Sequence, residues 1–175
     1  PEVRGNHYVE ATRYESTADK FEKLSIYLEG LDLFEKLFGY KSKSIIPPNY
    51  TWSHDFNQPV YEKGVRYFQG NRNMREPMPG AKDKYHHHYL GKTNSLGQIY
   101  MVRNVIFEPS MLGTKNIDPV GKCLNDMSIA FKMYKPAIIG THRLNYVGFI
   151  DVKNRDRNLQ LLKEMIRTAM KTWPE

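Results

Sequence analysis

The chain has 175 residues and a formal net charge of +7, with 26 basic and 19 acidic side chains spread along its length. A hydrophobic content of 40% indicates a folded protein, the length suits a single domain, and no apolar run approaches the ~20 residues that a membrane-spanning helix needs. The basic residues are not gathered into a stripe, so the composition also speaks against nucleic-acid binding.

Amphipathic helices alternate with short apolar strands along the sequence. Ser16 and Thr17 can cap a first helix and Gly39 can end it, because glycine readily adopts the left-handed conformation found there. The stretch 71–97, rich in Gly, Pro, Asn and charge, is interpreted as one long loop. The expected elements, in chain order, are a helix over 17–38, a strand over 41–46, a helix over 56–63, a strand over 65–68, one strand or a strand pair over 99–107, a helix over about 118–134, a strand over 136–140 and a final helix from about 151 to 173.

Three of the expected helices carry an apolar stripe at three- and four-residue spacing, which predicts one buried face on each. Apolar strands that alternate with amphipathic helices are typical of a parallel sheet covered by helices, so the predicted fold class is α/β. Four or five strands fall short of a complete (β/α) barrel, which usually takes ~200 residues or more, and we therefore expect a partial barrel. The stripes are Phe21, Leu24, Leu28, Leu31 and Phe34; Val120, Leu124, Met127, Phe131 and Tyr134; and Leu159, Leu162, Ile166, Ala169 and Trp173.

Polar residues that directly follow strands are the candidates for a functional site, because active sites of parallel α/β folds lie at the carboxyl ends of the strands. His142 is the first candidate, since imidazole exchanges a proton near neutral pH; the alternative is a structural histidine under a loop. Glu108 could act as an acid or base, or stand in a turn before proline. Arg143 could bind a carboxylate, phosphate or sugar oxygen, or pair with Glu108 or Asp151.

Five further residues are chosen as possible substrate contacts from their positions after strands. Trp52 could stack on a sugar ring, or it could simply cover the end of the barrel. Asn49 lies in the same loop, Arg103 and Asn104 interrupt the segment 99–107, and Asn145 follows His142 by three residues.

The sequence assigns no metal ligand. His86, His87 and His88 are adjacent, and because neighbouring side chains diverge, a surface loop is favoured over a metal site. The lone Cys123 excludes an internal disulfide and is interpreted as a buried thiol. There is no phosphate-binding glycine loop, nucleophile elbow or paired-cysteine motif, which speaks against nucleotide hydrolases, serine hydrolases and zinc fingers.

Two segments resemble motifs of the polysaccharide deacetylases (NodB-homology, carbohydrate esterase family 4). SIIPPNYTWSHDFNQPVYEKGVRYFQG is similar to the family's proline motif, in which a strand is followed by a helix and a glycine. PAIIGTHRLNYVG is similar to the last motif, a short apolar strand that ends in a histidine. With QIYMVRNVIFEPS, the arrangement resembles a bacterial branch common in Bacteroidetes, from about Phe34 onward.

This resemblance implies a distorted (β/α)7-type, TIM-like barrel that removes an acetyl group from a sugar with the help of a divalent metal such as zinc. In active family members one Asp and two His of the first two motifs hold the metal, and a neighbouring Asp is the base. Neither motif occurs in these 175 residues, so the chain is expected to be the C-terminal portion of a longer barrel. His142 matches the family's proposed general acid, whereas Ile46 stands where an arginine normally orients the base.

Three functions follow from these observations. The leading one is deacetylation of a polysaccharide or glycolipid sugar, with His142 as proton donor and Trp52 near the sugar. The second is a glycoside hydrolase on a related barrel, in which Glu108 pairs with another carboxylate. The third is a carbohydrate-binding barrel that has lost its metal and its activity.

Overall fold

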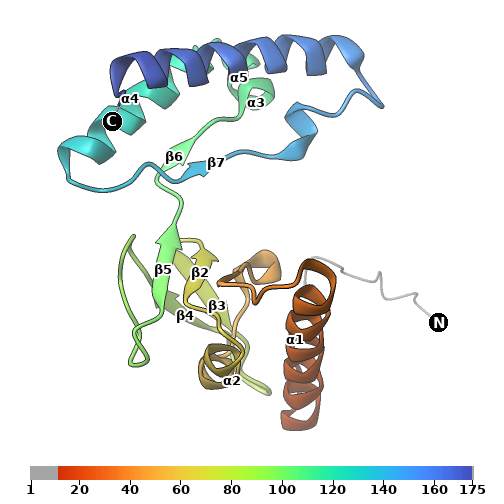
Figure 1. Ribbon diagram of the computed structural model, residues 1–175. Helices are drawn as coiled ribbons and strands as arrows, with labels where there is room; N and C mark the ends of the chain where they lie inside the picture. The colour runs from red at the N-terminus through yellow and green to blue at the C-terminus, as the bar shows by residue number, and fades with distance from the viewer. Residues whose placement is uncertain (1–11, 175) are drawn as a thin grey trace. The chain divides into compact units, whose positions relative to one another are not determined.

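The computed structural model describes residues 12–174, which divide into two compact units, one ending at Val102 and the other beginning at Arg103. Each unit has its own hydrophobic cluster. The predicted α/β class is confirmed, since the described part of the chain combines five α-helices with short parallel strands (Figure 1). These strands do not close into a barrel within residues 12–174, so the barrel and the single domain stay predictions.

The first unit begins with the predicted long helix, α1 (Thr17–Phe38). Its first turn is capped by Ser16, whose hydroxyl accepts a 3.1 Å hydrogen bond from the Asp19 backbone N–H. It ends at Gly39, whose φ of 75° lies in the left-handed region that favours glycine. Leu24, Leu28 and Leu31 of the predicted stripe pack against the core, but Phe21 is 62% exposed.

A three-stranded parallel sheet organises the core of the first unit. Strands β1 (Ser44–Ile45), β2 (Tyr67–Gly70) and β5 (Ile99–Val102) pair in the order β1-β2-β5. A short turn and the helix α2 (Asn57–Glu62) connect β1 to β2 and pack beside the sheet (Figure 1). The buried residues are Trp52, Phe56, Val60, Val65, Phe68, Met74, Tyr100 and Val102.

The predicted loop over 71–97 contains a β-hairpin instead. Strands β3 (Asn73–Glu76) and β4 (Lys84–His87) pair antiparallel, with Glu76 opposite Lys84 and Met74 opposite His86. Their residues are nearly all polar, so they lack the apolar alternation that predicts a strand. The hairpin matters for function, because it carries part of the histidine tract.

The second unit packs helices on a parallel pair of two-residue strands. Val105 and Ile106 pair with Ile139 and Gly140, so the predicted segment 99–107 is divided between the two units. Helix α4 contacts both α5 and β6. The elements of this unit are β6 (Val105–Ile106), α3 (Pro109–Gly113), α4 (Pro119–Lys132), β7 (Ile139–Gly140), a 3-10 turn (Arg143–Asn145) and α5 (Val152–Thr172).

Helix α5 turns a different face to the core than the stripe predicted. Leu159 and Ile166 are exposed, whereas Asn158 and Met165 are buried. Leu162 and Ala169 pack against the core as predicted. No helix between residues 12 and 174 has both the length and the apolar character that a membrane crossing requires.

Candidate functional site

Glu108 and His142 lie at the same edge of the β6–β7 pair. Each follows its strand by two residues, and because the strands are parallel, their carboxyl ends lie side by side. The Nδ1 atom of His142 is 2.6 Å from Oε1 of Glu108. The structure thus brings together the two residues that the sequence proposed as catalytic.

Asn145 completes this cluster from the 3-10 turn that follows His142. Its Nδ2 donates to Oε2 of Glu108 at 2.7 Å and to the backbone carbonyl of His142 at 2.9 Å. Its Oδ1 accepts from the backbone N–H of Ser110 at 3.2 Å, and the residue is buried. Asn145, predicted to contact substrate, therefore holds Glu108 and the backbone of His142 in place.

A buried asparagine of α5 fixes the position of Asn145 in turn. Nδ2 of Asn158 donates to the carbonyl of Asn145 at 2.9 Å and lies 2.7 Å from the Ser110 hydroxyl oxygen. The Ser110 hydroxyl and Asn158 Nδ2 both also reach Oδ1 of Asn154. This network connects the beginning of α3, the 3-10 turn and α5, and it anchors both strand ends of the site.

The cluster combines a buried carboxylate with an accessible imidazole. The Glu108 side chain is 12% exposed, whereas the His142 side chain is 71% exposed. Beside an ionised carboxylate, Nδ1 of His142 is the donor of this hydrogen bond and Nε2 takes no part in it. Such a pair can deliver or accept a proton at Nε2, which is general acid–base chemistry.

The other predicted residues of the second unit differ in what they contact. Asn104 is exposed and makes structural hydrogen bonds: its amide donates to the Pro136 carbonyl at 3.0 Å and accepts from the Ile138 backbone N–H at 2.7 Å. The aliphatic part of Arg103 packs over Gly140, where an added Cβ would lie 3.0 Å from its Cδ. Arg143 is exposed on the turn beside His142.

Trp52 and Asn49 belong to the first unit. Trp52 is 3% exposed, its indole N–H donates to Oδ1 of Asn57 at 2.8 Å, and its ring packs edge-on against Phe56. It therefore offers no ring face to a sugar, and its assignment as a substrate contact was wrong. Asn49 is exposed in the turn Pro48–Tyr50, with a left-handed φ of 48°.

The sequence analysis missed a second polar cluster, which is formed by His54, Glu76 and His86 in the first unit. Oε2 of Glu76 lies 3.0 Å from Nδ1 of His54 and 2.8 Å from Nε2 of His86. His87 takes no part, because alternate residues of a strand point to opposite faces, and the buried His88 stacks on Tyr100 instead. Because its members are 22 and 10 positions apart in the sequence, the cluster has no local sequence signature.

The electrostatics of this cluster favour an ionised Glu76 carboxylate. Burial alone would raise the pKa of Glu76, but hydrogen bonds from the ring and backbone of His54 and from the ring of His86 lower that pKa to about 2. For His86, burial lowers the pKa more than the nearby Glu76 raises it.

Comparisons of the chain with family models, curated proteins and solved structures gave no match.

Proposed function

We propose that this protein is a carbohydrate-active hydrolase, most specifically a deacetylase of polysaccharide or glycolipid sugars, with His142 as the proton donor. The observation that supports the proposal is the hydrogen bond from Nδ1 of His142 to the buried Glu108 carboxylate at the carboxyl ends of two parallel strands. In the full fold we propose, β6 and β7 are neighbouring strands of a (β/α)7-type barrel.

The proposed roles follow from the chemistry of amide hydrolysis. Water adds to the acetyl carbon and loses one proton to solvent; collapse of the resulting intermediate breaks the C–N bond, and the departing sugar nitrogen must take up a proton. The protonated ring of His142 supplies that proton from Nε2 and regains one from solvent, while Glu108 orients the ring and stabilises its charged form. Asn145 keeps Glu108 in place through its 2.7 Å hydrogen bond.

The resemblance to polysaccharide deacetylases also implies a metal that activates the water. The Asp and two His of the family's metal motifs have no counterpart among the matched residues of this chain, so we route no step through that ion. The roles of His142 and Glu108 are argued from their own geometry.

The alternative of a glycoside hydrolase gives Glu108 a different task. A glycosidase acid must carry a proton of its own. Both oxygens of Glu108 are instead engaged, one by Nδ1 of His142 and the other by Nδ2 of Asn145. This pattern favours a carboxylate that acts through a histidine.

Acetate release from N- and O-acetylated oligosaccharides tests the proposal. We expect His142→Ala to lower kcat by about 10² to 10⁴-fold, the range typical of general acid–base catalysis. His87→Ala is the matched control, because His87 is exposed and contacts Asn73 in the other unit. Unchanged kcat in His142→Ala, or no acetate release by the wild-type protein from any acetylated sugar, would contradict the proposal.

A further inference from the structure

We propose that His54, Glu76 and His86 form a binding site for one divalent transition-metal ion, with zinc as the preferred ion. The three side chains each offer one ligand atom, and these atoms all lie within 4.8 Å of one another. The site belongs to the first unit and is independent of the proposed role of His142. It goes beyond the proposed hydrolysis, because it can be tested by metal binding alone.

The distances between the ligand atoms suit a small ion. Oε2 of Glu76 lies 3.0 Å from Nδ1 of His54 and 2.8 Å from Nε2 of His86. Two ligands of a tetrahedral zinc ion at ~2.1 Å are roughly 3.4 Å apart. Oε2 of Glu76 would therefore lie only about 0.4 and 0.6 Å farther from the two ring nitrogens than it does now, with each ring presenting a nitrogen lone pair to the ion.

The carboxylate is held by a second set of hydrogen bonds that leaves the ligand oxygen facing the rings. Oε1 of Glu76 accepts from the backbone N–H of His54 at 3.0 Å and from the Ser53 hydroxyl at 3.3 Å. Because these bonds occupy Oε1, Oε2 is directed at the two imidazoles. In natural metal sites, hydrogen-bond partners of this kind orient the side chains that bind the metal and raise the affinity of the site for the metal.

The donor set favours zinc. Two imidazoles and one carboxylate are the ligands of one common class of catalytic zinc site, which keeps a fourth position open. His54, Glu76 and His86 supply this set, each with one ligand atom.

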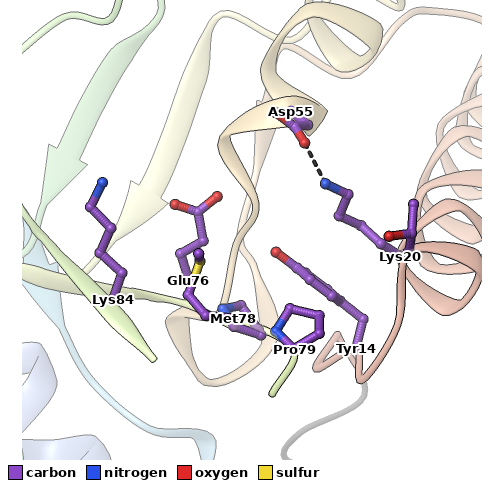
Figure 2. Close-up of a pocket in the computed structure, with 9 residues that line it drawn as sticks. Tyr14, Lys20, Asp55, Glu76, Met78, Pro79 and Lys84 are labelled. Carbon is purple, nitrogen blue, oxygen red and sulfur yellow. Dashed lines mark hydrogen bonds and ion pairs between the residues drawn. The ribbon is translucent and has the colours of Figure 1, made fainter. Parts of the chain in front are cut away.

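An ion at this site would be reachable from solvent. The side chains of His54, His86 and Glu76 are 36%, 22% and 14% exposed, so the cluster is neither sealed nor fully hydrated. Glu76 also lines a pocket of about 260 Å³, together with Tyr14, Lys20 and Lys84 (Figure 2). Figure 2 shows Tyr14 and Glu76 among the residues that line this pocket, which leaves room for a small ligand beside Glu76.

Only one histidine of the tract belongs to the site. His87 points to the opposite face of β4 and contacts Oδ1 of Asn73 at 2.9 Å. His88 is buried, with its ring stacked on Tyr100 at a centroid distance of 3.8 Å. Binding at the proposed site is therefore distinguishable from chelation by three consecutive histidines.

The proposal is tested by removing metal from the protein with a chelator and measuring Zn²⁺ binding by titration calorimetry. Co²⁺ is then used in place of Zn²⁺ as a spectroscopic probe. We expect one ion per chain. We expect the affinity to fall at least about 100-fold in His54→Ala and His86→Ala, beyond the ~10- to 100-fold effect typical of outer-shell changes. His87→Ala, the matched control within the tract, should bind as the wild type does.

A second variant covers the case in which an alanine variant fails to fold. His86→Cys retains a ligand at the same position, and Co²⁺ bound there should gain a sulfur-to-cobalt charge-transfer band. Three results would overturn the site: no stoichiometric binding of Zn²⁺ by the wild type, an equal loss in His87→Ala and His86→Ala, or no charge-transfer band in a folded His86→Cys protein.

Discussion

Asn158 is the residue whose side chain connects most of the second unit's polar site. It is fully buried on α5, and its Nδ2 lies within hydrogen-bond distance of the Asn145 carbonyl, the Ser110 hydroxyl and Asn154. A buried amide is stabilising only while it is paired, and its removal leaves the partner groups without a donor. Asn158 thus controls both the stability of the unit and the position of Asn145.

We expect Asn158→Ala to reduce the free energy of unfolding by about 1 to 3 kcal/mol, because the buried Asn145 carbonyl loses its donor. Urea unfolding followed by circular dichroism measures the change. The matched control is Gln160→Ala, an exposed amide two residues further along α5, which should change stability by less than about 0.5 kcal/mol. Equal unfolding midpoints for the two variants would show that the network contributes nothing.

Single residues also show where sequence reasoning succeeds. Placing Glu108 and His142 after two expected strands was sufficient to bring them together, because the rule about carboxyl ends of parallel strands depends only on chain order. Trp52 was misjudged, because position in a loop does not tell whether a side chain points to solvent or to the core. The cluster of His54, Glu76 and His86 depends on a hairpin register that the sequence does not specify.

At the scale of elements, helix ends were better predicted than helix faces. The caps Ser16, Asp118 and Asp151 each accept a hydrogen bond from a backbone N–H one turn into their helix. A cap is a local interaction and can be seen in the sequence. The buried face of α5 is decided by its tertiary partners, since Leu159 and Ile166 are no less apolar than the residues that are buried.

The cap of α4 allows a prediction about an element. Asp118 accepts from the backbone N–H groups of Val120 and Gly121, both at 3.0 Å. We expect Asp118→Ala to reduce the free energy of unfolding by about 1 kcal/mol, the usual effect of losing an acidic cap. Thermal unfolding monitored by circular dichroism checks the value.

Asp126→Ala is the matched control on the same helix. Asp126 pairs with Lys122 one turn away, and a surface pair of this spacing contributes only about 0.3 to 0.5 kcal/mol. If Asp126→Ala were as destabilising as Asp118→Ala, general loss of negative charge on α4 would explain both effects and the cap would not.

For the whole molecule, the fold class was accessible from sequence and the arrangement was not. Apolar strands alternating with amphipathic helices predict the α/β class, and the short parallel pairs confirm it. The division at Val102 falls inside the segment 99–107, where Arg103 and Asn104 interrupt the apolar residues and a strand pair was one of the two predictions. The pattern predicts burial on both sides of this interruption, but it does not tell that Val102 and Val105 enter different cores.

The proposed function of the molecule requires Glu108 to act through His142. When two residues act as one catalytic unit, the effects of their mutations on kcat are strongly non-additive. Once one residue is removed, removing the other lowers kcat little further. If Glu108 acted independently, for example as a glycosidase acid, the fold-loss of kcat in the double variant would be the product of the two single losses. Comparing single and double variants therefore tests the pair itself.

The most direct measurement is a double-mutant cycle on the rate of acetate release, with Glu108→Gln, His142→Ala and the combined variant. We predict that each single change lowers kcat and that Glu108→Gln has no further effect once His142 is alanine. If the two losses multiply, or if Glu108→Gln is as active as the wild type, Glu108 does not act through His142 and the account is contradicted.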